Sequence, residues 1–201
     1  KTGNYYMVIF SVKQDRAPSS IRKPTKHEMV YFVGDSRTVF MERALGNSAP
    51  SNVDFVCETG QGLTWFKETG YRELVRKLAR QSRNTRKAVI INLGVNDLQN
   101  INGYVSYMKA VATNLKKNYN CEMYYLSVNP VNSAVIRANA GYVRTEAQIA
   151  SFNKTIYQKL CNGSKRSFTY INTCTNLQKY GWISNRFNTC LLYTSPSPRD
   201  A

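Results

Sequence analysis

Residues 29–37 read MVYFVGDSR, a buried-type apolar run that ends in a glycine and is followed by short polar residues. Apolar runs of this length that end at turn residues are typical of buried β-strands. Residues 36–45 (SRTVFMERAL) have helical character and stop at Gly46, and glycine is favoured directly after a helix. The stretch therefore predicts a strand, a tight turn and a helix.

The same alternation continues along the chain. Strand-like runs are residues 53–57 (VDFVC), 88–93 (AVIINL), 123–128 (MYYLSV) and 168–171 (FTYI), and helix-like patterns cover residues 71–83, 102–119 and 145–160. Continuously apolar strands that alternate with helices indicate a parallel sheet covered on both faces. We therefore predict an α/β fold for residues 28–189, a three-layer α/β/α sandwich around a five-stranded, mostly parallel, flavodoxin-like sheet.

The composition limits the classes of function. The chain has 201 residues, 42% of them hydrophobic, which is enough for a core and excludes a wholly disordered chain. Its apolar runs are too short to span a bilayer, so we expect no membrane span. His27 is the single histidine, which excludes a metal site with several histidines. We predict neither a metal nor a cofactor.

The two ends of the chain differ from the middle. Residues 1–13 contain a strand-like run (GNYYMVIFSVK), read either as the last strand of an upstream immunoglobulin-like domain or as an extra edge strand. Residues 14–27 are polar, hold two prolines and are predicted to be a linker. Residues 190–200 (CLLYTSPSPRD) match, codon by codon, a translated transposon-end sequencing adapter. We interpret residues 190–201 as a non-native tail rather than a natural Ser/Pro-rich one, and expect the domain to be cut near Thr189.

Three of the predicted strands are followed by glycine and polar residues. These are GDSR at residues 34–37, TGQGLTW at residues 59–65 and GVND at residues 94–97. Ligands of parallel α/β sheets bind beyond the carboxyl ends of the strands. Each motif alone is common turn chemistry, and Ser36 alone is also a good helix cap. Their combination, in order and at successive strand ends, is far more specific.

At these residues the chain resembles the SGNH (GDSL-type) hydrolase superfamily, and its clostridial-type branch in particular. Residues 32–37, 60–65 and 94–98 fit that branch, and so does SVNPV at residues 127–131. The resemblance implies that Ser36 is a nucleophile. It also implies that the backbone N–H groups of Ser36 and Gly62 (Gly60 as the alternative) and the side-chain amide of Asn96 hold an oxyanion. Asp35 and Asp97 are interpreted as residues that hold the turns.

The family's remaining element, an Asp-x-x-His pair that supplies the base, is missing. No aspartate of the chain has a histidine three residues later. We expect that this pair was lost by truncation, and a naturally inactive enzyme is the less favoured alternative. His27 precedes the first predicted strand and Ser36 follows it, so a strand length of about 17 Å separates them. We therefore predict little esterase activity for this polypeptide.

The charge and the cysteines bear on partners. The chain has 28 Lys+Arg against 12 Asp+Glu, a net charge of +16, and seven basic residues lie between Arg72 and Lys87. We predict that this basic helix attracts a polyanion, in the first place an acidic cell-wall polymer. Nucleic acid ranks last, because no nucleic-acid-binding motif accompanies the charge. Cys161 and Cys174 flank a helix–strand connection, and both a disulfide and free thiols remain open.

The preferred function is a secreted or cell-surface serine esterase. It would act on a small-molecule or glycan ester, either as a carbohydrate acetylesterase or as a short-chain acyl esterase. The alternative is a non-catalytic SGNH-like module that binds a glycan or a cell-wall polymer. A nucleotide-binding α/β domain is disfavoured, because the chain has neither a G-x-G-x-x-G nor a P-loop motif.

Overall fold

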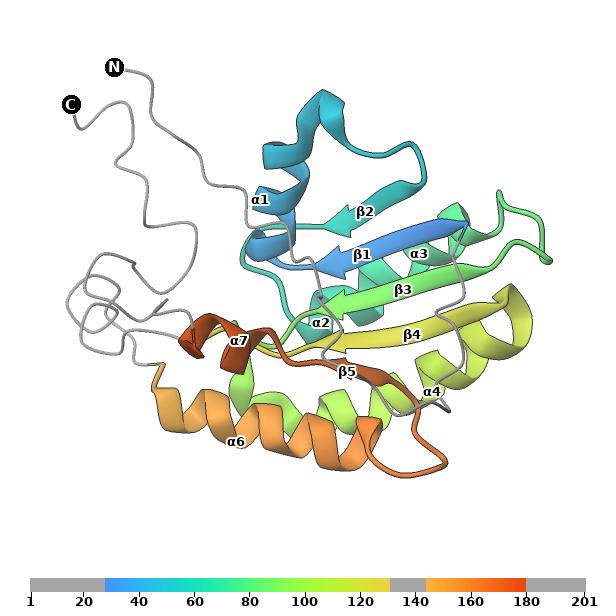
Figure 1. The fold of residues 1–201 in the computed structure, drawn as a ribbon. Helices are drawn as coiled ribbons and strands as arrows, with labels where there is room; N and C mark the ends of the chain where they lie inside the picture. Colours follow the sequence, from blue (N-terminus) through green and yellow to red (C-terminus); the bar gives the residue numbers. More distant parts are fainter. Residues whose placement is uncertain (1–27, 131–143, 180–201) are drawn as a thin grey trace, which may run out of the picture.

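The structure is a computed structural model that describes residues 28–130 and 144–179. Its five strands form one parallel sheet in the order β2-β1-β3-β4-β5 (Figure 1). They are β1 (Met29–Gly34), β2 (Val53–Cys57), β3 (Lys87–Asn92), β4 (Cys121–Leu126) and β5 (Thr169–Ile171). The predictions for residues 1–27, including His27, and for the tail at residues 190–201 lie outside the described residues.

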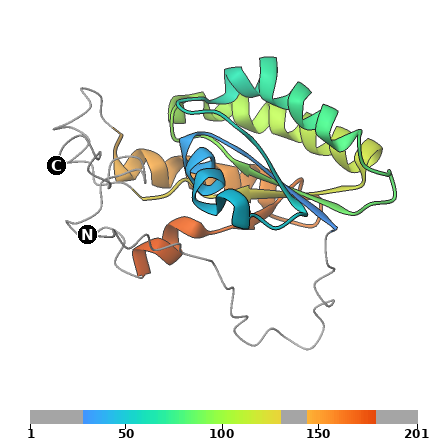
Figure 2. The ribbon, with the colours of Figure 1, turned by 90° about the horizontal axis from the view of Figure 1, so that it is seen from above.

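Helices cover both faces of this sheet. They are α1 (Ser36–Leu45), α2 (Leu63–Trp65), α3 (Tyr71–Leu78), α4 (Ile101–Tyr119), α6 (Glu146–Ile156) and α7 (Thr173–Lys179), with single turns η1 (Gly46–Ser48), η2 (Phe66–Gly70), η3 (Leu98–Asn100) and η4 (Tyr157–Cys161). Figure 2 shows α1 and α7 on one side of the sheet and α3 and α4 on the other. The chain moves from β1 outward to β2 and then back past β1 to β3. Crossovers between parallel strands are almost always right-handed, which is why the helices that follow β1 and β2 pack on opposite faces. The predicted three-layer sandwich is confirmed.

The helix predicted over residues 71–83 is shorter than expected. It ends at Leu78, which is buried together with Leu74. Beyond Leu78 the sequence offers no large apolar side chain until β3, so further helical turns would bury nothing. Residues 79–86 form turns instead, with Gln81 N–H donating to the Leu78 carbonyl.

Lys87, predicted to lie on a basic helix, is the first residue of β3 and is only 1% exposed. Its Nζ donates to the carbonyl oxygens of Ser82 (2.8 Å), Thr85 (2.8 Å) and Tyr119 (3.1 Å). An ammonium group has three N–H donors, and all three are used. Burial lowers the pKa of this ammonium group. The prediction that Lys87 contributes to a basic surface is therefore wrong: Lys87 instead connects the turn before β3 to the end of α4.

Gly94 fixes the path of the chain as it leaves β3. Its φ is +118°, a backbone angle that residues with a side chain rarely adopt. A Cβ at this position would lie 2.5 Å from the ring of Phe152. That ring packs edge-on against Tyr104 of α4, with the ring centroids 5.4 Å apart. The β3 loop therefore runs directly over the aromatic contact between α4 and α6.

We expect Gly94→Ala to lower the free energy of unfolding by about 2–5 kcal/mol, because backbone strain adds to overpacking against Phe152. Gly163→Ala is the matched control. Gly163 also has a positive φ, +83°, but nothing lies within 4 Å of its added Cβ, so only about 1–2 kcal/mol is expected. Urea denaturation measures both variants, and equal losses would contradict the packing argument.

Candidate functional site

The three predicted motifs leave the sheet from adjacent strands. Gly34, at the carboxyl end of β1, pairs with Cys57 of β2 on one side and with Asn92 of β3 on the other. The segments after these strands carry Ser36, Gly62 and Asn96, respectively. All three predicted residues therefore lie at the same edge of the sheet, and Ser36 follows β1, which lies between β2 and β3.

Ser36 is the first residue of α1, and it is 3% exposed. The helix is capped by Asp35, whose Oδ1 accepts the backbone N–H of Arg37 at 3.0 Å. The alternative interpretation that Ser36 is itself the cap is therefore wrong. Its position at the helix start places its backbone N–H in a field that favours negative charge.

A buried ion pair fixes the turn that carries Ser36. The guanidinium of Arg37 donates to both carboxylate oxygens of Asp35, from Nε at 2.9 Å and from Nη2 at 2.8 Å. Nη2 also donates to the carbonyl of Asn92 on β3, at 3.1 Å. A Cβ at Gly34 would collide with the side chain of Thr38, so the turn requires glycine. The loop after β1 is thus held to β3 as well as to its own helix.

The carboxylate of Asp97 connects the second and third motifs. Its Oδ2 accepts the backbone N–H of Leu63 at 2.9 Å, and its Oδ1 accepts the hydroxyl of Tyr104 at 2.6 Å. A Cβ at Gly62 would lie 2.5 Å from this carboxylate, so the close approach requires glycine. Gly60, by contrast, has a φ of +78° and open space around it, so glycine is favoured there by the backbone angle of the turn and not by a close contact.

Asn96 has a hydrogen bond at each end of its side-chain amide. Its Nδ2 donates to the carbonyl of Gln61 at 2.8 Å, and its Oδ1 accepts from Nη2 of Arg144 at 2.9 Å. The first bond joins the third motif to the second. Arg144 could not be identified from the sequence, because no local pattern links it to Asn96, 48 residues earlier.

Three titratable side chains near these motifs are unsuited to act as a base for Ser36. The carboxylate of Asp35 is engaged by Arg37, and that of Asp97 by Leu63 and Tyr104. Burial, together with the nearby groups of Tyr125 and Asp97, raises the pKa of Tyr104, so its phenol stays protonated and donates a hydrogen bond to the Asp97 carboxylate. Residues 28–130 and 144–179 contain no histidine.

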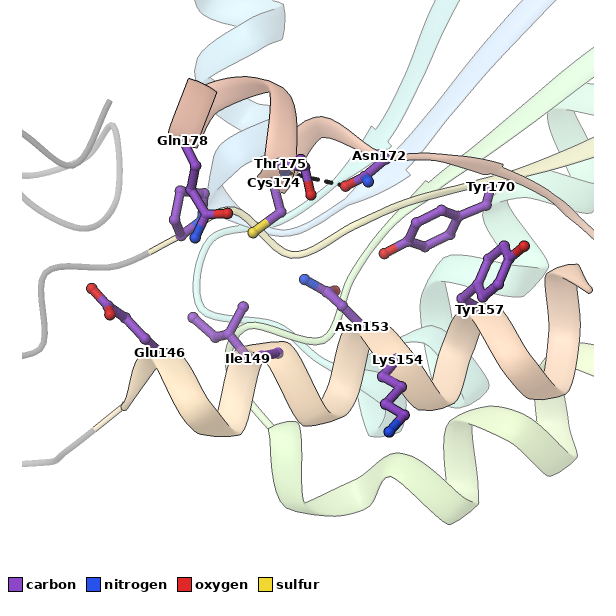
Figure 3. Close-up of a pocket in the computed structure, with 12 residues that line it drawn as sticks. Glu146, Ile149, Asn153, Lys154, Tyr157, Tyr170, Asn172, Cys174, Thr175 and Gln178 are labelled. Carbon is purple, nitrogen blue, oxygen red and sulfur yellow. Dashed lines mark hydrogen bonds between the residues drawn. The ribbon is translucent and has the colours of Figure 1, made fainter. Parts of the chain in front are cut away.

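A pocket of about 520 Å³ lies between α6 and α7 (Figure 3). Ser36, Gly62 and Asn96 do not line it. Asn153, which does, is held by the backbone of Val128, accepting its N–H at 2.8 Å and donating to its carbonyl at 2.9 Å. Burial raises the pKa of the Cys174 thiol, whose sulfur points into this space, so the thiol is a poor nucleophile. The pocket is therefore lined by other residues than those predicted to form the site.

The two alternatives left open for the cysteines are resolved: Cys161 and Cys174 are both free thiols. Burial raises the pKa of Cys161 to about 12. Among residues 28–130 and 144–179, no cluster of three or more His, Cys, Asp or Glu side chains is arranged to hold a metal ion. In the same residues no helix is long and apolar enough to cross a membrane.

Solved structures with low sequence identity to this chain share its fold. A Streptococcus pneumoniae protein described as a platelet activating factor superposes with a TM-score of 0.61 at 17% identity, over 86% of this chain and 78% of that one. The catalytic domain of peptidoglycan O-acetyltransferase A from the same species gives 0.50 at 14% identity, over 82% and 79% of the chains. A Parabacteroides merdae protein described as a GDSL-like lipase gives 0.50 at 14% identity, over 83% and 90%.

The chain therefore has a parallel three-layer α/β/α fold with its polar loops at the carboxyl edge. More narrowly, this fold is shared with solved structures that include a protein described as a GDSL-like lipase, and it agrees with the fold predicted from the sequence. No protein-family model matches the sequence, and neither does any curated protein.

We expect Asp97→Ala to lower the free energy of unfolding by about 2–4 kcal/mol, because two donors that this carboxylate binds lose their acceptor. Asp54→Ala is the matched control, since Asp54 is 39% exposed and pairs with Lys77 at 2.7 Å. A partly exposed pair of this kind contributes about 1 kcal/mol or less. Urea denaturation compares the two, and a loss at Asp97 no larger than that at Asp54 would contradict the connecting role.

Proposed function

We propose that this protein is a serine ester hydrolase that works through an acyl-serine at Ser36. The observation that supports this most directly is the arrangement of the three loops. Ser36, Gly62 and Asn96 follow adjacent strands of one sheet edge, and hydrogen bonds from Asn96 to Gln61 and from Leu63 to Asp97 hold the second and third loops together. The fold is shared with a GDSL-like lipase and an acetyltransferase domain.

The proposed reaction has two halves. Oγ of Ser36 attacks the carbonyl carbon of the ester while a base takes its proton, giving a tetrahedral oxyanion. Collapse of this intermediate breaks the bond to the alcohol, which leaves with a proton from the conjugate acid of the base. Water then attacks the acyl-serine in the same way, releasing the carboxylic acid and restoring Ser36.

The oxyanion would be held by neutral donors. These are the backbone N–H groups of Ser36 and Gly62 (Gly60 as the alternative) and Nδ2 of Asn96. Fixed donors of this kind stabilise the charge that develops in the transition state more than they stabilise the neutral ester, which is what accelerates the reaction. Loss of one such donor typically costs about 10²–10³ in kcat.

The base is the part that this chain does not supply, because no Asp-x-x-His pair occurs in its 201 residues. We infer that turnover by this polypeptide is low. The gene sequence beyond codon 189 discriminates the two hypotheses. An Asp-x-x-His pair there supports the enzyme, whereas its absence supports a non-catalytic module that binds a glycan or a cell-wall polymer.

The proposed substrate is an ester of a small molecule or of a glycan, with an acetyl or another short acyl group. Because an acyl-serine can pass its acyl group to water or to another hydroxyl, the likeness to an O-acetyltransferase domain is compatible with the same first half-reaction. We propose a secreted or cell-surface location, where such glycans are found.

The reactivity of Ser36 can be tested on this chain with a fluorophosphonate probe and added imidazole as an external base. We expect mass spectrometry to find the adduct on Ser36 and none on this peptide in Ser36→Ala. Asn96→Ala should slow the labelling about 10²-fold, because an oxyanion donor is lost. Asn114→Ala, at an exposed asparagine of α4 that binds Tyr71, is the matched control and should label at the original rate.

Two results would contradict this proposal. Labelling that bypasses Ser36 would show that the serine is not the nucleophile. An Asn96→Ala variant that reacts as fast as the unsubstituted chain would remove the amide from the oxyanion site. Rapid ester turnover without imidazole would instead show that the chain has a base of its own.

We also propose that the protein attaches to an anionic cell-wall polymer through a basic surface at the amino ends of the strands. We define this surface by Arg76, Arg80, Arg83, Lys116, Lys117 and Arg166, all exposed. Arg83 donates to the Lys117 carbonyl at 3.2 Å, and Lys116 to the Arg166 carbonyl at 3.4 Å, which joins the segments before β3, β4 and β5. Burial and the positive charge of Arg166 lower the pKa of Lys116, as expected where cations gather.

We expect soluble polyphosphate to bind this chain with an affinity that falls steeply as salt concentration rises, because counterions are released on binding. Replacing Arg76, Arg80 and Arg83 together by Gln should weaken binding and flatten the salt dependence. Replacing Arg43, Lys154 and Lys159 by Gln removes the same charge from other exposed positions and is the control. If the two triple variants weaken binding equally, the attraction depends on net charge alone and the proposed basic surface is not the binding site.

A further inference from the structure

We propose that Arg144 is a positioning residue that sets the orientation of the Asn96 amide and so presents its N–H group to an oxyanion. This inference rests on the proposed function for its catalytic meaning. Its geometric part, that Arg144 decides which way the amide faces, stands on the hydrogen bonds of three residues.

The two ends of the Asn96 amide meet partners of opposite kinds. The carbonyl of Gln61 can only accept a hydrogen bond, and it receives one from Nδ2 at 2.8 Å. The guanidinium of Arg144 can only donate, and it donates to Oδ1 at 2.9 Å. If the amide were turned over, an oxygen would face the carbonyl and an N–H group would face the guanidinium. Both contacts would then be repulsive, so the pair of partners allows a single orientation.

This orientation leaves one donor available. An asparagine amide has two N–H bonds on Nδ2, and Gln61 takes one of them. Within residues 28–130 and 144–179, Nδ2 has no other acceptor. The remaining N–H is the donor that the proposed reaction requires from Asn96. It lies on the segment after β3, and β3 pairs with β1, the strand that Ser36 follows.

The charge of Arg144 also strengthens this donor. A guanidinium stays protonated at all ordinary pH values, and a charged donor on Oδ1 polarises the amide toward a more positive N–H. The positive charge lies one amide group away from the oxyanion that would form. Both effects act on the transition state in the same direction as the hydrogen bond itself.

The backbone of Arg144 is held close to a rigid element. Arg144 directly precedes Thr145, the N-cap of α6, which forms a capping box: Thr145 Oγ1 accepts from Gln148 N–H at 3.1 Å, and Gln148 Oε1 accepts from Thr145 N–H at 2.9 Å. Further along α6, Asn153 binds both backbone groups of Val128, just after β4. The start of α6 therefore holds Arg144 at the carboxyl edge of the sheet, where Asn96 lies.

The direct test is the side-chain amide signal of Asn96 in the ¹⁵N-labelled full chain, assigned by its disappearance in Asn96→Asp. We expect Arg144→Met to move both proton resonances of this amide and to increase their exchange with water. Arg144→Lys, which keeps a donor, should retain an intermediate position. Arg43→Met removes an exposed arginine on α1 and should leave the signal unchanged.

The same variants are then labelled at Ser36 with the fluorophosphonate and imidazole. We expect Arg144→Met to slow labelling about tenfold, less than the 10²–10³ for loss of a donor, with partial recovery in Arg144→Lys. If Arg144→Met does not fold, the shift in Arg144→Lys decides. An Asn96 signal unmoved by either variant overturns the inference, as does unchanged labelling of a variant whose signal has moved. If the unsubstituted chain fails to label at Ser36, the proposed function fails, while the amide spectrum still decides what orients Asn96.

Discussion

The arrangement of the candidate site depends on one carboxylate. Asp97 lies in the loop after β3 and accepts two hydrogen bonds, from the backbone N–H of Leu63 in the loop after β2 and from the hydroxyl of Tyr104 on α4. Loops that follow the carboxyl ends of strands can otherwise move independently, because the hydrogen bonds between strands end where the loops begin. A charged acceptor that reaches across β1 couples the outer two loops, so the segments that carry Gly62 and Asn96 keep a constant separation on either side of Ser36.

The same carboxylate explains why glycine occurs at position 62. A Cβ at that position would lie 2.5 Å from the Asp97 carboxylate, whereas Gly60 has open space around it and needs glycine only for its backbone angle. A glycine in this motif thus has a structural reason that does not depend on catalysis. For the proposed reaction, the absence of a side chain at Gly62 would also leave its backbone N–H unobstructed.

Much of this could be predicted from the sequence, and the remainder could not for identifiable reasons. The apolar run at residues 29–33 and the similar runs that follow it predicted the strands, because strands that are buried on both faces of a parallel sheet are continuously apolar. The position of Lys87 could not be predicted, because a lysine in a basic run carries no sign that three backbone carbonyls from two segments will surround it. Arg144 was missed because its contact with Asn96 is created by the position of α6, a tertiary feature with no local pattern.

The hydrogen bonds also separate the two halves of the proposed chemistry. Asp35 and Arg37 hold the turn of Ser36, Asp97 holds the outer loops, and Arg144 holds the amide of Asn96, all without a histidine. In the proposed reaction, the groups that would stabilise the oxyanion are carried by loops that these hydrogen bonds hold in place. A base on another segment would act beside them. Preorganised donors need not reorient during the reaction. In the proposed mechanism, much of the rate would therefore depend on the residues that stabilise the oxyanion, which take no part in proton transfer.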